Sequence, residues 1–237
     1  MRWGAGVLAL GLGGSLLVSS PQSADAEVRP AFVAAPAAVH APDHSFVHAE
    51  AAPLPTVMAD VERGAVRIVD GFWKRHFREL SNRRYRSPQT KGGYQGAGGP
   101  RCGGRPSVAF NAFYCRPGDF LAWDEQLMSA GYEKIGDSWV YLIIAHEWGH
   151  AIQDRVKLRP GRYGVELQAD CLAGATLQGA ADDGLVRVDQ GDAEELQRTL
   201  AAAADDFPWT NQGDHGNAEQ RIGAFRAGAQ RGLRACF

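Results

Sequence analysis

Apolar residues recur at helical spacing through most of the chain beyond residue 55, and this pattern predicts a mainly helical domain. The predicted helix over residues 138–156 is apolar on most of its sides, which is typical of a helix in the middle of a core. The last predicted helix begins at Asn217 and has Gln220 three residues later, a pair that fits a variant of the capping box. We expect helices over residues 56–80, 138–156, 165–180, 192–204 and 217–232.

Two short strands are expected between the first two helices. Val108–Cys115 and Asp119–Trp123 lie on either side of a Pro117-Gly118 turn, which is typical of a hairpin. Residues 84–90 favour an edge strand at best, and the glycine-rich residues 91–104 favour a connecting loop. The predicted fold class is α+β, a mainly helical domain with a small antiparallel sheet.

The N-terminus has the layout of a secretory signal peptide, residues 1–26. Arg2 precedes an apolar or small stretch over residues 6–18, and Ala24-Asp25-Ala26 offers small residues at a cleavage site. The alternative is an uncleaved N-terminal membrane anchor, but the apolar stretch is shorter than the ~20 residues that a span needs. We therefore expect a secreted protein.

The segment after the signal peptide has a different composition from the rest. Residues 27–55 are rich in Ala and Pro, which is typical of an extended linker that buries little apolar area. The folded domain is then expected to cover residues 56–237, and no segment in it is apolar enough to span a membrane.

Composition and charge restrict the classes of partner. Apolar residues make up 45% of the chain and charged residues 22%, which suits a globular domain with a core. The formal net charge of −2 gives no reason to expect nucleic acid or an acidic membrane surface as a partner.

The four cysteines, Cys102, Cys115, Cys171 and Cys236, fit a protein exported to an oxidising compartment. We favour the pairing Cys102 with Cys115, which closes a short loop, and this leaves Cys171 with Cys236. The two other pairings stay open, because sequence alone does not choose between them. A structural zinc bound by all four is disfavoured, because no Cys-x-x-Cys spacing is present.

The segment His146-Glu147-Trp148-Gly149-His150 on the apolar helix carries the chemistry. Residues four apart lie on one helix face, so His146 and His150 are placed to bind one Zn²⁺. Glu147 borders the open position of such a metal and is expected to act as the general base toward an attacking water. The ordinary alternative is a solvated helix face, but on an apolar helix these groups would be buried at a cost unless they were paired.

Catalytic zinc needs a third protein ligand and an open position for water. A third His six residues after the second, with a Gly between, is excluded, because Gln153 and Val156 stand at those positions. The other arrangement takes a Glu from the following helix. Glu166 follows a Pro160-Gly161 turn and suits two antiparallel helices, so we expect it to be the third ligand.

Asp170 lies four residues beyond Glu166 on the same predicted helix face. We expect it to accept a hydrogen bond from the far ring nitrogen of a metal-bound His and so to fix its tautomer. The alternative for both carboxylates is an exposed charged face. Apolar and small neighbours disfavour that alternative, namely Leu167, Ala169, Cys171, Leu172 and Ala173.

Four segments together resemble the bacterial neutral zinc metallopeptidases. They are WVYLIIAHEWGHAIQ (residues 139–153), ELQADCLAG (166–174), Asp214-His215-Gly216 followed by Glu219-Gln220-Arg221, and Phe113-Tyr114-Cys115 before a turn and strand. The resemblance covers roughly residues 56–237. It implies a zincin-like fold and a zinc-dependent peptidase of the Glu-ligand class, with the Cys102–Cys115 neighbourhood matching as well.

His215 is a second candidate catalytic residue. In metallopeptidases with a Glu ligand, a His or Tyr beyond the zinc ligands commonly stabilises the oxyanion of the tetrahedral intermediate. A turn His bonded to the main chain is an equal alternative. The predicted function is hydrolysis of peptide or protein substrates. The alternative is a non-catalytic secreted protein with a structural metal site, which would need no carboxylate at Glu147 and would be closed by a fourth protein ligand.

Overall fold

The computed structural model describes residues 54–157, 164–205 and 215–237. The predicted signal peptide, residues 27–53 of the predicted linker and the Pro160-Gly161 turn lie outside the described residues. The described helices are α1 (Leu54–His76), α2 (Glu125–Lys134), α3 (Ser138–Val156), α4 (Gly164–Asp182), α5 (Asp192–Ala202) and α6 (Ala218–Arg231). The strands are β1 (Gln89–Tyr94), β2 (Ala112–Cys115) and β3 (Phe120–Asp124), and short 3-10 turns are η1 (Phe77–Glu79), η2 (Gly96–Gly98), η3 (Arg116–Gly118) and η4 (Leu233–Cys236).

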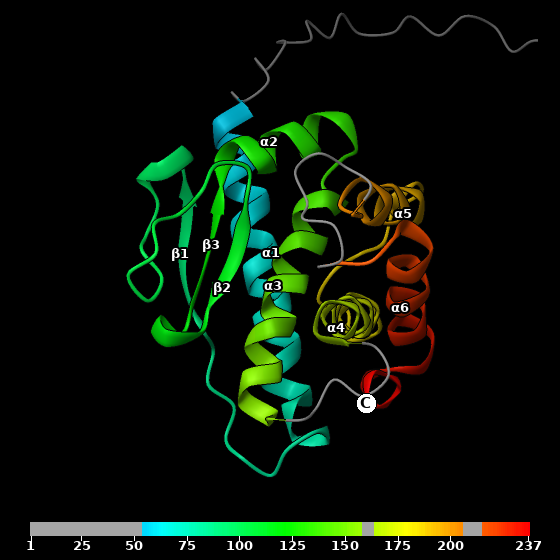
Figure 1. Ribbon diagram of the computed structural model, residues 1–237. Helices are drawn as coiled ribbons and strands as arrows, with labels where there is room; N and C mark the ends of the chain where they lie inside the picture. Colours follow the sequence, from blue (N-terminus) through cyan, green and yellow to red (C-terminus); the bar gives the residue numbers. More distant parts are fainter. Residues whose placement is uncertain (1–53, 158–163, 206–214) are drawn as a thin grey trace, which may run out of the picture. The chain divides into compact units, whose positions relative to one another are not determined.

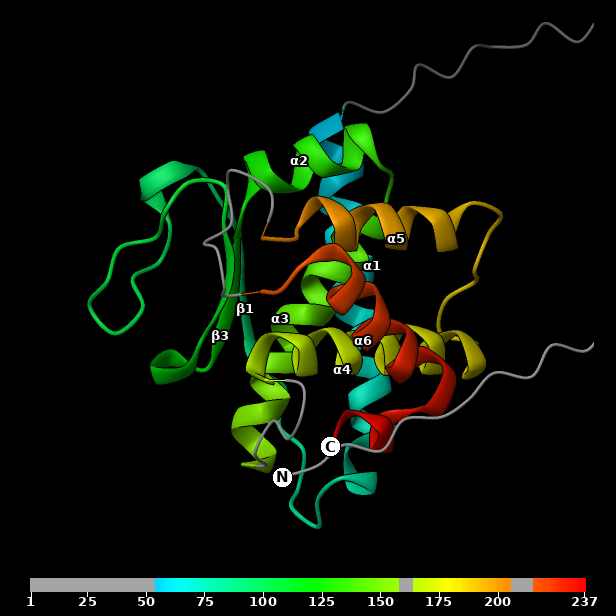
Figure 2. The ribbon, with the colours of Figure 1, turned by 45° about the vertical axis from the view of Figure 1, so that its right-hand side comes forward.

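The elements form three layers, with α1 and α3 between the sheet and the group α4, α5 and α6 (Figures 1 and 2). The expected α+β, mainly helical fold class is confirmed. The core lies where the middle layer meets α4, and the indole rings of Trp73 and Trp148 pack there with Leu172. The first predicted helix begins slightly earlier than expected, at Leu54, and its last turn is the separate 3-10 turn η1.

Helix α3 has the predicted bounds and is buried along most of its length. It ends where Lys157 takes a left-handed conformation (φ 52°), and the main-chain N–H of Lys157 donates to Gln153 O at 3.0 Å. Because apolar residues cover most of its circumference, α3 packs against α1, α4, α5 and β2 at once. Any polar group on this helix is therefore enclosed by the core or opens into a cleft.

Close packing of α4 on α6 depends on two glycines. A Cβ atom at Gly228 would lie 1.8 Å from Cys171 O, and one at Gly174 would lie 2.0 Å from Phe225 O. Only residues without a side chain permit this approach of the two backbones. Helix α6 starts with the predicted capping box, in which Asn217 and Gln220 each bond to the other's main-chain N–H at 3.0 Å.

The sheet is mixed, so the predicted antiparallel sheet is only partly correct. Strand β3 lies in the middle, antiparallel to β2 as expected and parallel to β1. Strand β1 also extends to Tyr94, into the stretch expected to be a loop. A register shift between Thr90 and Gly92 accommodates the glycines, and Gly92 has a φ of 74°. A Cβ atom at Gly93 would lie 2.5 Å from Cγ of Glu125, so a larger residue there would require the exposed Glu125 side chain to move.

Helix α2 was not predicted, because it is short and only Met128 and Gly131 are buried on it. Its start is set by Asp124, whose carboxylate accepts a hydrogen bond from the main-chain N–H of Gln126 at 2.8 Å. The fully buried Asp124 also accepts from the N–H of Phe110 at 2.8 Å. It therefore ties α2 to the loop that precedes β2.

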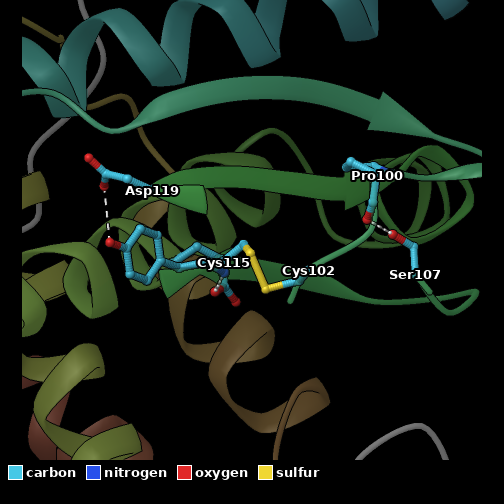
Figure 3. Close-up of a disulfide and its surroundings, with 7 residues drawn as sticks. Pro100, Cys102, Ser107, Cys115 and Asp119 are labelled. Atoms are coloured by element: carbon cyan, nitrogen blue, oxygen red, sulfur yellow. Dashed lines mark hydrogen bonds between the residues drawn. A yellow bond between two sulfur atoms is a disulfide. The ribbon is translucent and has the colours of Figure 1, made fainter. Parts of the chain in front are cut away.

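Both disulfides have the favoured pairing, Cys102–Cys115 and Cys171–Cys236, each with a Cα–Cα distance of 5.5 Å. The first bridge joins the loop before β2 to the end of that strand (Figure 3). In the same loop, the Ser107 hydroxyl donates to Pro100 O at 2.7 Å. The second bridge holds η4 on α4. Within the described ranges, every helix is too short or too polar to serve as a bilayer span.

The packing of α4 on α6 predicts opposite effects for two glycines of the same helix. Gly228→Ala is expected to destabilise the fold by about 1–3 kcal/mol or more, because its Cβ atom collides with main-chain atoms of Cys171. Gly223→Ala is the matched control, since a Cβ atom there would meet nothing within 4 Å beyond the neighbouring backbone of its own helix. It should be neutral or stabilise by about 0.5–1 kcal/mol, because Ala loses less backbone entropy in a helix. Urea unfolding of both variants measures the difference, and equal stabilities would contradict this account.

Candidate metal centre

Helix α3 presents His146 and His150 one turn apart on the side that faces α4. Their rings stand nearly perpendicular, with an interplanar angle of 89° and centroids 4.9 Å apart. His146 is only 4% exposed, and His150 is half-buried. Trp148, between them in sequence, lies in the core and donates its indole N–H to the hydroxyl oxygen of Tyr85 at 2.9 Å. The apolar residues of α3 therefore fix the helix while its two imidazoles face the neighbouring helix.

Gly149 lets α4 come close enough to complete the group of ligands. A Cβ atom at this position would lie 3.1 Å from both Cα and O of Ala169, which is tighter than ordinary packing. The absence of a side chain therefore brings the backbone of α4 against α3 between the two histidines. Glu166, in the first turn of α4, then lies opposite both rings.

The donor atoms of three predicted ligands converge. Oε2 of Glu166 lies 3.2 Å from Nε2 of His146 and 3.2 Å from Nε2 of His150. All three donor atoms lie within 4.8 Å of one another. Ligands of a tetrahedral zinc at 2.0–2.1 Å are about 3.3 Å from each other, so these separations fit a small divalent ion. These residues could therefore hold a metal ion.

Asp170 orients the ring of His146. Its Oδ1 lies 2.8 Å from Nδ1 of His146, and the carboxylate also accepts two hydrogen bonds from the guanidinium of Arg221, both at 2.8 Å. Because a carboxylate only accepts, Nδ1 carries the proton and Nε2 is left to face Glu166. Burial opposes ionisation of Asp170, but the positive charges of Arg221 and His146 lower its pKa to about 2.

The electrostatics of the ligands favour a positive charge between them. Burial disfavours the imidazolium of His146, but the charge of Asp170 and the hydrogen bonds to both carboxylates raise its pKa. Burial would likewise raise the pKa of Glu166, yet the hydrogen bonds to His146 and His150 hold it far below its usual range. Nδ1 of His146 donates to Asp170, and Nδ1 of His150 lies 2.8 Å from Oε1 of Gln153. The Nε2 lone pairs of both rings and the Glu166 carboxylate therefore need a shared cation, either a proton or a metal ion.

Glu147 lies beside the three donors and is not one of them. Its Oε2 accepts a hydrogen bond from the main-chain N–H of Tyr114 at 2.8 Å. Tyr114 is in β2, the edge strand of the sheet on this side, because the strand order is β1-β3-β2. The free edge of β2 thus faces α3 and holds this carboxylate. The Tyr114 hydroxyl points elsewhere and donates to Asp119 at 3.0 Å.

His215 also reaches the site, from the turn before α6. Its Nε2 lies 3.9 Å from Oε2 of Glu166, and its ring centroid lies 6.4 Å from that of His146. Asp205 holds this turn, because its carboxylate accepts from the main-chain N–H groups of His215 at 3.0 Å and of Gly216 at 2.5 Å. His215 is outside the group of three converging donors.

His150 and Glu166 line a cleft of about 730 Å³, and His146 lies buried behind them. Strand β2 lines it on one side, and α3, α4 and the His215 turn complete it, so that Glu147, His150, Glu166 and His215 share one space. All of the predicted site residues are therefore close together, with Asp170 behind them in the protein interior. No family model, curated protein or solved structure matches this chain.

A second group of acidic residues also converges within 4.8 Å, namely Asp137, Asp192 and Glu195. Burial raises the pKa of Asp137, as do the charges of its two neighbours. This group contains only carboxylates and lacks the histidines that zinc favours.

Three residues of the site were missed from the sequence. Arg221 is 2% exposed and braces Asp170, and Gln153 accepts from Nδ1 of His150 with its side-chain oxygen at 2.8 Å. Gln168 is fully buried and bonds to Gln153 at 3.1 Å. Only the position of Gln153, three residues after His150 on the same helix, was a local signal.

The convergence of donors predicts a specific loss of metal affinity. Glu166→Ala is expected to weaken binding of Zn²⁺ by more than ~100-fold, beyond the range typical of residues that only support a ligand. Glu133→Ala, an exposed carboxylate on α2, is the control and should bind Zn²⁺ like the wild type. Competition with a chromophoric chelator measures both affinities. Unchanged affinity in Glu166→Ala would remove Glu166 from the ligands.

Proposed function

We propose that this protein is a secreted zinc-dependent metallopeptidase that hydrolyses peptide or protein substrates. His146, His150 and Glu166 would hold the zinc. The observation that carries the proposal is the position of Glu147, in the same cleft as the donors but bonded to the N–H of Tyr114 instead of joining them. A structural metal site needs no such carboxylate.

The donor set fits a catalytic zinc. It consists of two imidazole nitrogens and one carboxylate oxygen, a combination found where zinc keeps one position for water or substrate. Bound there, zinc would supply an acidified water and polarise the carbonyl of the scissile bond. Among the described residues the convergent group contains three donors and no fourth, which favours a site that is open.

Glu147 is the general base of the proposed reaction. Its carboxylate accepts a proton from the attacking water and then donates it to the leaving amine. The hydrogen bond from Tyr114 N–H restrains one oxygen, so the carboxylate is oriented before substrate binds. Because α3 carries both Glu147 and the two histidines, the base and the ligands are fixed relative to each other by one rigid helix.

His215 is proposed to stabilise the oxyanion of the tetrahedral intermediate. Its Nε2 faces the cleft near Glu166, and the main-chain bonds to Asp205 restrain its turn. A donor prearranged at the position of developing charge needs no reorganisation during the reaction.

Peptide substrates suit the surroundings of the centre. The cleft runs beside β2, which pairs on one side only, with β3. An edge strand next to a cleft accommodates an extended chain by main-chain hydrogen bonds. The resemblance to the bacterial neutral zinc metallopeptidases supports the same activity and a zincin-like fold. The two disulfides favour an oxidising compartment, in agreement with the predicted signal peptide.

Glu147→Gln separates catalysis from a structural role of the metal. The variant is expected to bind Zn²⁺ normally and to lose about 10²–10⁴-fold in turnover, because an amide cannot accept the proton. Cleavage of a fluorescence-quenched peptide library, with and without chelator, gives the readout, and Glu133→Gln serves as the control. Normal turnover in Glu147→Gln, or activity that survives the chelator, would refute the proposal.

His215→Ala tests the oxyanion role. Turnover is expected to fall about 10²–10³-fold while metal affinity stays within a few-fold of the wild type. The same peptides and the same chelator competition measure the two quantities. If metal affinity falls in parallel with turnover, His215 acts on the ligands and not on the oxyanion.

A further inference from the structure

Which ring nitrogen of His150 carries the proton depends on the side-chain amide of Gln153. This amide can face the ring with either its oxygen or its nitrogen. Nδ1 of His150 lies 2.8 Å from Oε1 of Gln153. If this amide turned over, its NH₂ group would face Nδ1, the ring proton would move to Nε2, and the nitrogen facing Glu166 could no longer bind a metal. Whatever fixes the direction of the Gln153 amide therefore decides whether His150 is a ligand.

Two acceptors fix that direction. Nε2 of Gln153 donates to Val165 O at 2.6 Å and to Oε1 of Gln168 at 3.1 Å. In the reversed orientation the Gln153 oxygen would face both of these acceptors, and this would leave two unfavourable oxygen–oxygen contacts. Val165 O belongs to the first turn of α4, but Gln168 is itself an amide and must be oriented in turn.

The chain of hydrogen bonds ends at the C-terminus. Nε2 of Gln168 donates to the main-chain O of Cys236 at 2.8 Å. A carbonyl can only accept, so it sets the direction of Gln168, then of Gln153, and finally the Nδ1 proton of His150. Gln168 and Cys236 are both fully buried, so water does not compete for these groups.

A disulfide holds this carbonyl in place. Cys236 is the penultimate residue of the chain and is bridged to Cys171, which lies three positions after Gln168 on α4. The bridge therefore fixes Cys236 O next to the helix that carries Gln168. Without it, the last turn η4 would depend on its packing against α4 and α6 alone.

We propose that the disulfide-anchored C-terminus positions His150 for metal binding through Gln168 and Gln153. The inference rests on the proposed metal site and adds the two glutamines and the Cys171–Cys236 bridge as positioning residues. They are not among the three converging donors and act through His150. Their effect is to keep the Nε2 lone pair of His150 directed at the site.

The hydrogen bonds from Cys236 O through Gln168 and Gln153 to His150 are called the relay below. Binding of Zn²⁺ to the full chain tests it. Gln153→Leu is expected to weaken affinity about 10- to 100-fold, and Gln168→Leu roughly tenfold, at the lower end of the range for supporting residues. Gln178→Leu, the same change at an exposed position of α4, is the matched control and should leave affinity unchanged. Equal affinities of Gln168→Leu and Gln178→Leu would overturn the relay.

A double-mutant cycle separates positioning from general loss of structure. If Gln168 acts only through Gln153, the double variant binds Zn²⁺ as weakly as Gln153→Leu alone. Additive losses would mean independent structural effects and would contradict the proposal. Replacing Cys171 and Cys236 by Ala should reduce affinity as much as Gln168→Leu does. If that variant does not fold, the glutamine cycle alone decides.

An NMR signal distinguishes failure of the relay from failure of the proposed function. The Nδ1 proton of His150 should give a protected imidazole N–H resonance in the wild type and lose that protection in Gln153→Leu and Gln168→Leu. If the wild type binds no Zn²⁺, the proposed function fails, and this resonance still tests the relay. Its absence from the wild type, or its persistence in both variants, would overturn the relay.

Discussion

A buried carboxylate holds the site together. Asp170 has no exposed surface and lies between the imidazole of His146 and the guanidinium of Arg221, so it joins α3, α4 and α6 through one set of charged hydrogen bonds. Desolvation of these groups is costly, and it is offset only if each partner lies within hydrogen-bonding distance. The close approaches at Gly149 and Gly228 are what allow the three helices to meet that requirement.

The helices and the sheet contribute different parts of the site. The three converging donors come from α3, which is buried along most of its length, and from the first turn of α4. The sheet contributes a main-chain N–H, from Tyr114 at the edge of β2, that holds Glu147. The ligands therefore depend on helix packing, whereas the orientation of the proposed base depends on how β2 lies along α3. The Cys102–Cys115 bridge secures the end of that strand.

Local signals allowed much of the fold to be predicted from the sequence. Periodicity predicted α3 with its observed bounds, and residues four apart on one helix predicted the facing imidazoles. Strand β1 was expected only as an edge strand over residues 84–90, because the glycines in its second half leave a weak pattern. Helix α2 was not predicted, because it is short and mostly exposed. The roles of Gln168 and Arg221 were also missed, since their partners lie 68 and 51 residues away and only tertiary packing brings them together.

The two imidazoles donate to different acceptors, and each acceptor is held in turn by a group from the late part of the chain. His146 donates to a carboxylate that is paired with Arg221 of α6, and His150 donates to an amide whose chain of hydrogen bonds ends at Cys236 O. A carboxylate acceptor makes an imidazole ring more basic than an amide acceptor does. The two imidazoles are therefore expected to differ in strength as metal ligands. Helices α3 and α4 carry all three proposed metal ligands, but Arg221 and Cys236 O lie outside these two helices. A site with both rings correctly oriented therefore forms only when α6 and the C-terminus have docked.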